Sequence, residues 1–406
     1  MRKLFTVTLA GIVFLVLFVL GLHTPRETAA QYKLSETTLT EGDTDEGITA
    51  AVQAEVKDTA AAHENPASGD DSKGDAFRST TEETAQTGSN PTDEWIPQID
   101  TSVSVHKGAR IAVIGKNRKG EFWKLVQKGM KKAVSDINAA YDFSKDEQLK
   151  MTYEGPSSEE DIEAQINTFD AVLSENPDVV CLSAIDMNSC LAQLEMAYEN
   201  KIPVIAFDSN VSESDLVTAF RASDNYEIGR QGAYRLALAL GKKGKVVVLS
   251  ISGKGQSLLE RVRGFNDCIR EYKEIEVLEP VYIEKASETE KMITTLFEEN
   301  PDLKGVFCTN ADISDNFLAL DIVKQAQDLA IVGVDATRRQ QEAIRSGRET
   351  GCVSQHPYAI GYQAIWAAAE ATAPPERRKI PEQILITPAW ICAENIDDPV
   401  LSDYLY

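Results

Sequence analysis

Polar residues that could bind a small polyhydroxylated molecule follow several short apolar runs of the chain. They include carboxylate, amide and guanidinium groups beside an aromatic pair, at residues 117–123, 186–188, 208–210, 223–225, 253–255, Arg261, 310–312, Asp335 and Gln355. A sugar hydroxyl both donates and accepts hydrogen bonds, so such groups can bind it in pairs. An aromatic ring can cover the C–H face of a sugar. The composition of these segments therefore predicts a sugar-like ligand.

Other kinds of chemistry find little support in the sequence. The chain has six Cys and four His, without a C-x-x-C or H-E-x-x-H motif, so we expect no metal site. Residues 253–255 lack the third glycine and the downstream acid of a dinucleotide fingerprint, and we expect no cofactor. No nucleophile–base pair can be assembled, so we do not expect an enzyme. The net charge of −23 argues against a nucleic-acid partner.

The cysteines are scattered over predicted strands and helices. They are Cys181, Cys190, Cys268, Cys308, Cys352 and Cys392. We expect buried free thiols, and a pair between Cys352 and Cys392 remains an alternative.

Alternating strands and helices must position the polar segments. Apolar, β-branched runs predict strands at residues 110–114, 149–153, 179–182, 204–207, 217–220, 245–250, 275–280, 305–308, 330–334 and 351–354. Helical patterns fall between them, as at residues 122–139 and 257–272. Continuous apolar strands between helices indicate parallel sheets covered on both faces. The number of units favours two such α/β sheets, with ligand-binding loops at the carboxyl ends of the strands.

The first 107 residues differ from the rest. Residues 4–22 carry no charge and follow a basic start, which predicts a signal peptide or a signal-anchor helix within residues 1–24. The charge pattern places the amino terminus inside and the remainder outside the membrane. Residues 25–107 are acidic and lack an apolar period, so we expect a disordered linker. Within it, the apolar residues 95–97 could dock on the folded domain, which we expect at residues 108–406.

Six segments of the folded part occur in the order and on the elements of a known family. They are Phe122–Gly129, Ile202–Asp208, Ala222–Arg230, Glu260–Phe265, Cys308–Asn310 and Val332–Asp335. The chain resembles the type I periplasmic binding proteins, in particular the ribose and galactose group that serves ABC sugar importers. The resemblance implies two doubly wound α/β lobes joined by a three-segment hinge. The lobes would hold residues 109–221 with 355–386, and residues 222–354 with 387–406.

The resemblance also implies which residues contact the ligand. They are the ring-stacking pair Phe122 and Trp123, the carboxylates Asp208 and Asp335, the guanidinium of Arg261 and the amides of Asn310 and Gln355. The family's ribose binders have an Asn where this chain has residues 119–121, and an Arg where it has Ser209. These departures leave the fold intact and put ribose itself in doubt.

Several of these residues also have structural interpretations. They are a core position for Trp123, an ion pair or cap for Arg261, a turn for Asn310 and a hinge for Gln355. Asp208 and Asp335 each end a very apolar strand, where an unpaired carboxylate is costly, and this favours a ligand role for both.

Three functions follow as hypotheses. The first is an extracytoplasmic, non-catalytic receptor that presents a sugar to the membrane permease of an ABC importer. The second is a membrane-anchored sugar sensor that feeds a histidine kinase, favoured by a long tether and an uncleaved apolar helix. The third, a sugar-responsive transcription regulator, is disfavoured because the chain starts with an apolar run and is acidic overall. The identity of the sugar stays open.

Overall fold

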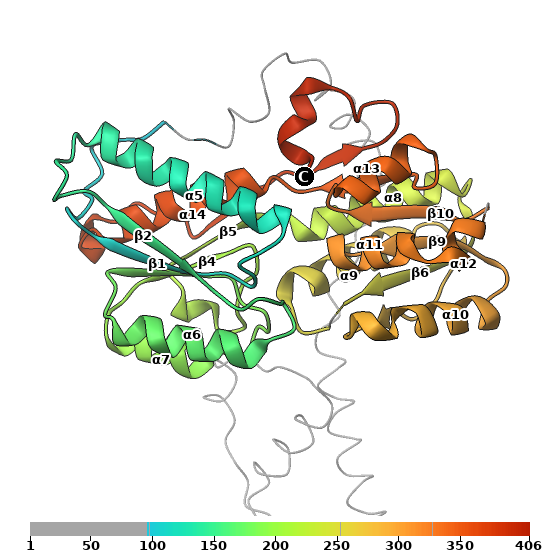
Figure 1. Ribbon diagram of the computed structural model, residues 1–406, viewed down its shortest axis with the longest axis horizontal. Helices are drawn as coiled ribbons and strands as arrows, with labels where there is room; N and C mark the ends of the chain where they lie inside the picture. Colours follow the sequence, from blue (N-terminus) through green and yellow to red (C-terminus); the bar gives the residue numbers. More distant parts are fainter. Residues whose placement is uncertain (1–95, 97, 252, 327) are drawn as a thin grey trace, which may run out of the picture. The chain divides into compact units, whose positions relative to one another are not determined.

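Two β-sheets, each covered by helices on both faces, make up the described part of the chain (Figure 1). The computed structural model describes residues 96, 98–251, 253–326 and 328–406, all within one unit of the chain, residues 88–406. The apolar run at residues 4–22 and most of the acidic linker lie outside the described residues. No helix in the described ranges is long and apolar enough to cross a membrane.

In the described ranges, the first sheet has six parallel strands in the order β12-β5-β4-β3-β1-β2. They are β1 (Arg110–Ile114), β2 (Lys150–Glu154), β3 (Val179–Leu182), β4 (Val204–Phe207), β5 (Ala219–Ser223) and β12 (Gln383–Ile386). One face is covered by α5 (Glu121–Ala140) and α14 (Pro357–Ala371), and the other by α6 (Ile162–Ser174) and α7 (Leu191–Glu199) (Figure 1).

Strand β1 is apolar at every position after the exposed Arg110, and its packing shows why. Ile111 and Val113 pack into the core with α5 and α14, whereas Ala112 and Ile114 pack into the core with α6 and α7. Because successive side chains point to opposite faces, a strand covered on both sides needs an unbroken apolar run. This burial also fixes the register, and β1 pairs with β2 and β3 on either side.

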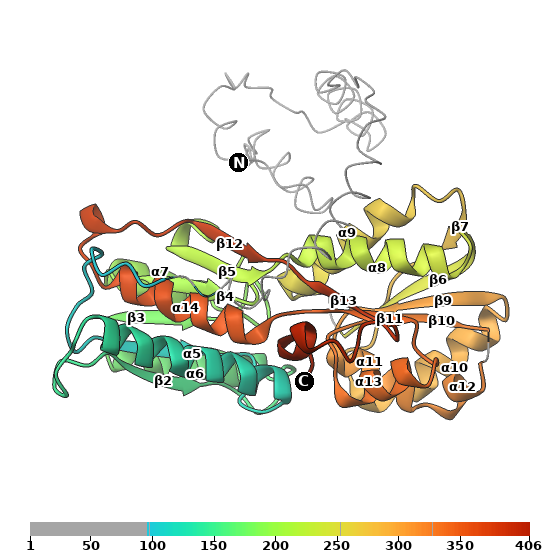
Figure 2. The same ribbon diagram turned by 90° about the horizontal axis from the view of Figure 1, so that it is seen from above.

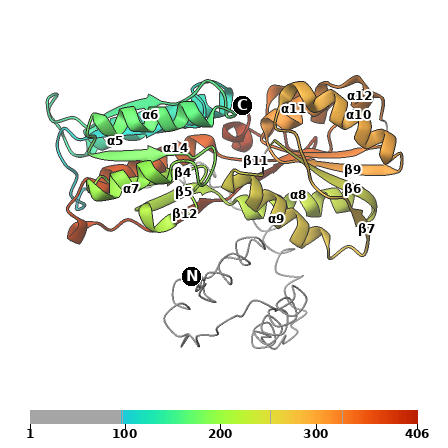
Figure 3. The ribbon, with the colours of Figure 1, turned by 90° about the horizontal axis from the view of Figure 1, so that it is seen from below.

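The second sheet, as far as the structure describes it, has the order β13-β11-β10-β9-β6-β7, with β8 beside β6. Its strands are β6 (Lys243–Ser250), β7 (Glu274–Val277), β8 (Val281–Tyr282), β9 (Leu303–Cys308), β10 (Ala330–Val334), β11 (Gly351–Ser354) and the antiparallel β13 (Ala389–Ile391). Its helices are α8 (Asn225–Ala239), α9 (Gln256–Ile269), α10 (Thr289–Glu299), α11 (Ala311–Ala319), α12 (Asp321–Gln325) and α13 (Arg338–Arg345). Figure 3 shows α8 and α9 on one side of this sheet, and α10, α11 and α12 on the other.

The described chain passes three times between the sheets: from β5 to α8, from β11 to α14, and from β12 to β13. Figure 2 shows the last passage, where β12 leads directly into β13. The two predicted α/β lobes are therefore confirmed. Short 3-10 helices complete the described elements at Ser214–Leu216, Ala286–Glu288, Pro375–Arg377 and Pro399–Tyr404.

In each lobe, two glycines bring a pair of helices into backbone contact. A side chain at Gly129 of α5 would meet the carbonyl oxygen of Tyr358, and one at Gly361 of α14 would meet that of Val126. Gly229 of α8 and Gly264 of α9 do the same in the second lobe, against the carbonyls of Arg261 and Tyr226. These four glycines let the helices α5 and α9, which carry predicted ligand residues, pack closely against their partners.

The structure differs from the sequence prediction in places. The strand expected at residues 275–280 is split into β7 and β8, and Pro280 directly precedes the second piece, where it cannot donate to a ladder. Strands β12 and β13 were not predicted, because most of their residues are partly or fully exposed.

Packing also begins before Gly108. Val103 and Val105 are buried, Ile96 contacts the first core, and the Tyr141 hydroxyl donates to the Val103 carbonyl over 2.7 Å. The apolar residues in this stretch therefore belong to the first lobe, although we expected the linker to extend to residue 107. Residues 95 and 97 of the expected docking segment lie outside the described residues.

Candidate ligand-binding site

A cavity of about 670 Å³ opens between the carboxyl ends of the strands of the two sheets. All seven residues expected to contact a ligand line it: Phe122, Trp123, Asp208, Arg261, Asn310, Asp335 and Gln355. The polar segments at residues 186–188 and 223–225 do not line it, and Lys254 and Gly255 line an adjoining cavity of about 390 Å³. Parallel strands place their following loops at the same edge of a sheet, which explains why residues so distant in sequence meet here.

Two aspartates occupy equivalent positions in the two lobes. Asp208 follows β4 and Asp335 follows β10, and both have a left-handed backbone, with φ of 59° and 76°. Each backbone N–H donates to a carbonyl of the neighbouring strand, over 2.8 Å to Arg221 and 3.1 Å to Val353. A positive φ is uncommon for residues other than glycine, and such strain concentrates at functional positions. The geometry aims both carboxylates at the cavity.

Asp208 is held in a buried ion pair. The Lys116 Nζ lies 3.0 Å from the Asp208 Oδ2, and the side chains of these two residues are only 9% and 6% exposed. The Ser183 hydroxyl donates to the same oxygen over 2.9 Å. Lys116 comes two residues after β1 and was not singled out from the sequence, although its position after a buried strand was a usable signal. The first-lobe carboxylate is thus already neutralised by a cation.

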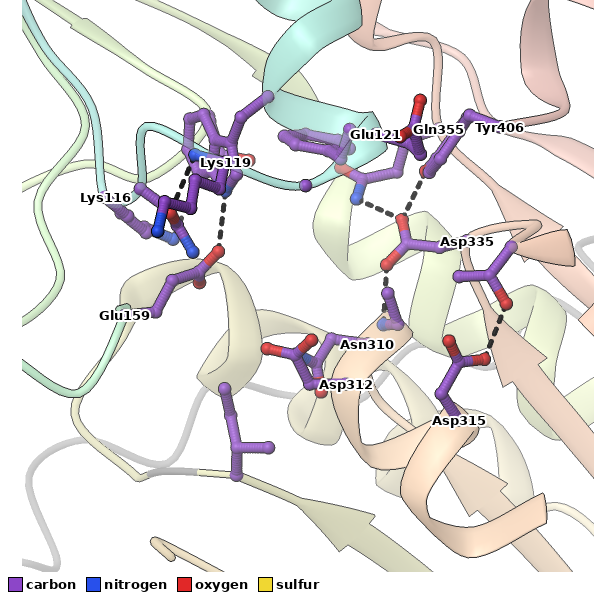
Figure 4. A pocket seen from close by; sticks show the side chains of 18 of the residues that line it. Lys116, Lys119, Glu121, Glu159, Asn310, Asp312, Asp315, Asp335, Gln355 and Tyr406 are labelled. Carbon is purple, nitrogen blue, oxygen red and sulfur yellow. Dashed lines mark hydrogen bonds and ion pairs between the residues drawn. The ribbon is translucent and has the colours of Figure 1, made fainter. Parts of the chain in front are cut away.

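Asp335 is instead surrounded by neutral donors (Figure 4). The Gln355 amide donates to Oδ1 over 2.7 Å, the Tyr406 hydroxyl donates to the same oxygen over 2.6 Å, and the Ala311 N–H donates to Oδ2 over 2.7 Å. Burial, followed by the charge of Asp335, raises the pKa of Tyr406 well above its usual value, so the phenol stays protonated and donates. Asp335 thus accepts three hydrogen bonds at the cavity wall without a cation partner.

Tyr406 was missed by the sequence analysis because it belongs to the segment after the third crossing. That segment is anchored on the second lobe, since the Ser354 hydroxyl donates to the Tyr404 carbonyl over 2.6 Å and the Tyr406 N–H donates to the Ala336 carbonyl over 3.1 Å. The Tyr406 ring also meets Phe122 of the first lobe, with centroids 5.9 Å apart. An aromatic contact thus closes one end of the cavity.

Phe122 and Trp123 have different roles at the cavity. Trp123 is 4% exposed and packs in the first core, with its ring 6.4 Å from that of Phe207. Its indole N–H donates to Glu159 over 2.7 Å at the cavity wall. Phe122 is less buried, and its ring lies 5.1 Å from that of Trp123 in an edge-to-face arrangement. Trp123 is therefore a core residue that also lines the site, and Phe122 offers the more accessible face.

Arg261 and Asn310 line the second-lobe side. Arg261 is 3% exposed and donates to the Asn225 side chain over 2.9 Å and to the Thr309 carbonyl over 2.7 Å, so it joins loops rather than pairing within its helix. Asn310 precedes α11 without capping it through its side chain, and its buried Oδ1 has no hydrogen-bond partner in the structure. A buried acceptor without a donor is costly, and a ligand in the cavity could donate to this atom only after the side chain rotates.

Two further carboxylates line both cavities, Glu159 from the first lobe and Asp312 from the second (Figure 4). Burial raises the pKa of Glu159 to about 7, with the charges of Asp312 and Asp208 adding to this and Lys116 and the Trp123 N–H opposing it. Asp312 is exposed to solvent within the cleft, although protein surrounds it on most sides. The surrounding protein displaces water from the carboxylate, and this loss of solvation, with the charges of Asp335 and Asp315, raises the pKa of Asp312 as well.

Metal and disulfide sites are absent from the described ranges. No group of three or more His, Cys, Asp or Glu there could hold a metal ion. All six cysteines are free, including Cys352 and Cys392, so the pair considered from the sequence is not formed in this structure.

A family model for the periplasmic binding protein domain matches residues 111–373, more than half of the 406-residue chain. The chain belongs to this family. Periplasmic binding proteins bind a substrate rather than transform it, so the site described above is a binding site and not a catalytic one.

This periplasmic binding protein has relatives of known name. It is 25% identical over 245 residues to a xylitol-binding protein from Mycolicibacterium smegmatis, covering 59% of this chain and 68% of the relative. It is 26% identical over 192 residues to a ribose import binding protein from Salmonella typhimurium, covering 47% of this chain. The chain spans 64% of that relative's length.

Solved structures share the fold of this periplasmic binding protein over most of the described residues. An ABC transporter solute-binding protein from Agrobacterium vitis, bound to α-D-tagatopyranose, has a TM-score of 0.67 and 25% identity, covering 73% of this chain and 99% of its own. A second from the same organism, bound to D-fucose, has a TM-score of 0.66 and 26% identity, covering 73% and 100%.

Proposed function

We propose that the protein binds a monosaccharide-like ligand in the cavity between its lobes and presents it to the permease of an ABC importer. The observation that carries this proposal is the convergence of the seven expected residues on one cavity. Their groups suit hydroxyls that donate and accept together. The names of the relatives and the sugars bound to the similar structures support the same ligand class.

In this proposal the residues of each lobe contact one side of the sugar. Phe122, Trp123 and Asp208 belong to the first lobe, Arg261, Asn310 and Asp335 to the second, and Gln355 lies at a crossing between them. A ligand that contacts both lobes favours the closed arrangement, because only differential contacts can shift such an equilibrium. The three crossings are the segments where a hinge would bend.

A thermal-shift screen of residues 88–406 against pentoses, hexoses and polyols tests this proposal. A ligand at one hundred times its dissociation constant adds about 2.7 kcal/mol to the free energy of unfolding, so the melting temperature should rise clearly for at least one sugar. A complete panel without any shift would contradict the proposal.

A second candidate is a sensor that presents the sugar to a histidine kinase, anchored in the membrane outside the cytoplasm. It is favoured by the apolar run at residues 4–22 and the long acidic segment that follows. Deleting the gene separates the two roles. Loss of radiolabelled sugar uptake supports the importer, whereas intact uptake with loss of sugar-dependent transcription supports the sensor.

A further inference from the structure

The carboxylates Glu159 and Asp312 stand on opposite lobes at the boundary between the two cavities. Glu159 lies just before α6 in the first lobe, and Asp312 lies in the first turn of α11 in the second. Both residues line the 670 Å³ cavity and the adjoining 390 Å³ cavity (Figure 4). Lys116, Ile251 and Leu258 also line both cavities, so a substituent that extends from one cavity toward the other passes beside this set of residues, the two carboxylates included.

Neither carboxylate has a cation partner in the described ranges. Glu159 accepts the indole N–H of Trp123 over 2.7 Å, and Asp312 has no hydrogen bond or ion pair there. Lys116 is a buried cation that lines both cavities and whose charge acts on Glu159, but it is held 3.0 Å from Asp208. The other cations that line the main cavity are Arg261, which is bonded to Asn225 and Thr309, and the exposed Lys119, Arg338 and Arg339.

The two carboxylates are acceptors that this part of the cavity offers from both lobes. Asn310 lies next to Asp312 at the cavity wall, but its Oδ1 is buried and a ligand donor reaches it only if the side chain rotates (Figure 4). A hydroxyl carries one donor and brings its own lone pairs, whereas an ammonium carries three donors and no acceptor.

We propose that the ligand carries a protonated amine, as an amino sugar or amino polyol does, and that its ammonium binds between Glu159 and Asp312. This rests on the proposed sugar-binding function and names the class of sugar. Hydrogen bonds between ammonium and carboxylate are charge-assisted and stronger than those of a hydroxyl.

Lobe closure strengthens the argument. The lobes are already in contact in this structure, where the Met187 N–H donates to the Lys254 carbonyl over 3.2 Å, and the charge of Asp312 raises the pKa of Glu159 because like charges in a partly buried site repel. A ligand ammonium between them turns this repulsion into two attractions. The cation therefore favours the closed state by more than a neutral sugar of the same shape can.

The charge state of Glu159 gives the proposal a pH dependence. Five groups face this carboxyl: Lys116 after β1, Tyr153 of β2, Asp208 after β4, Asp312 in α11 and the Trp123 N–H in α5. Burial raises its pKa to about 7, so below that pH the group is largely protonated and neutral. Ammonium binding prefers the ionised form. Affinity should therefore rise as the pH increases from about 5 to about 6.5, a range in which a hexosamine ammonium is still largely protonated.

Isothermal titration calorimetry with matched ligands tests the proposal without any mutation. The full-length protein, in a detergent that lacks a sugar headgroup, is titrated with D-glucosamine, D-galactosamine and D-mannosamine. The controls are the neutral parent sugars and the N-acetyl derivatives, which keep the nitrogen but lose the charge. We expect at least one amine to bind about tenfold or more tightly than both of its controls.

The outcomes separate the two proposals. If neutral sugars bind and no amine binds more tightly than its parent, the amine proposal is overturned and the sugar-binding function stands. If neither neutral nor amino sugars bind, the sugar-binding function fails, and the amine proposal fails with it.

Two variants locate the ammonium. Glu159→Gln and Asp312→Asn each keep the shape of the side chain, and each should lower the ratio of amine affinity to neutral-sugar affinity about tenfold. Glu159→Gln should also flatten the pH dependence. The matched control is Glu163→Gln, an exposed glutamate of α6 outside both cavities, which should keep the ratio. Circular dichroism checks that each variant folds, and an unchanged ratio in both folded cavity variants would refute this position for the cation.

Discussion

Asp208 and Asp335 hold the same place in their respective lobes but differ in how their charge is balanced. Both follow a buried strand, both have a left-handed backbone and both are about 5% exposed or less. Asp208 is paired with Lys116, whereas Asp335 accepts hydrogen bonds from an amide, a phenol and a backbone N–H. One fold position therefore holds an ion pair in one lobe and an acceptor of three neutral hydrogen bonds in the other.

The same contrast extends to the neighbours of the two aspartates. In the first lobe, Trp123 is part of the core as well as the cavity wall. In the second, the Asn310 Oδ1 remains an unsatisfied acceptor. Substitutions at the first-lobe wall of the cavity should therefore lower the stability of that lobe. The second-lobe wall has polar groups whose hydrogen-bonding capacity is not used within the protein. Substitutions on the two sides should differ accordingly.

The largest effect is expected when the ion pair is broken. Lys116→Met leaves the Asp208 carboxylate buried without its cation, which should lower the free energy of unfolding by about 3–5 kcal/mol. Urea denaturation of residues 88–406 measures this. The double variant with Asp208→Asn should recover part of the loss, because no buried charge then remains. A loss below about 1 kcal/mol for the single variant would mean that the pair is solvated.

The next effect concerns the aromatic pair. Trp123→Ala removes a packed core side chain and should cost about 3 kcal/mol of stability, near the lower end for such substitutions because the residue also lines a cavity. Phe122→Ala, at the partly exposed neighbour, is the matched control and should cost less stability while weakening sugar binding. Equal losses of stability in thermal denaturation would contradict the division of roles between the two rings.

On the second-lobe side, ligand affinity should respond. Asp335→Ala should weaken binding of the preferred sugar by about 1.5–3 kcal/mol, the scale of a hydrogen bond to a charged group. It should also reduce ligand-induced compaction, because one lobe loses its grip. Calorimetry and small-angle scattering, with exposed Asp328→Ala as the control, measure both. A variant that binds and compacts like the parent would remove Asp335 from the site.

The smallest effect is expected at Tyr406. Tyr406→Phe keeps the ring beside Phe122 but removes one of the three donors to Asp335, which should cost about 1 kcal/mol of stability, as for one net hydrogen bond. Denaturant titration monitors the change, with exposed Tyr198→Phe as the control. A gain in stability would show that the phenol is strained in its contact with Asp335.

Most of the fold could be predicted from the sequence, because the buried residues of strands such as β1 and β10 form unbroken apolar runs. It also indicated the strand-end polar residues, since Asp208 and Asp335 stand where an apolar run stops. Tyr406 and Glu159 could not be found in this way, because Tyr406 follows no predicted strand and Glu159 lies farther along the loop after β2 than the residues next to the strand end. Their places depend on the third crossing and on the loop before α6, and these are set by tertiary packing rather than by a local pattern. The exposed edge strand β12 was missed for the same reason.

The paired glycines of the helices have a consequence for damage at a distance. Gly129 and Gly361 hold α5 against α14, and Gly229 and Gly264 hold α8 against α9, with no room for a methyl group at any of the four positions. A single alanine there would push the two helices apart and shift Phe122 in the first turn of α5 or Arg261 in the middle of α9. A protein that is correctly produced and exported would then lose ligand binding through an added methyl group that never touches the ligand.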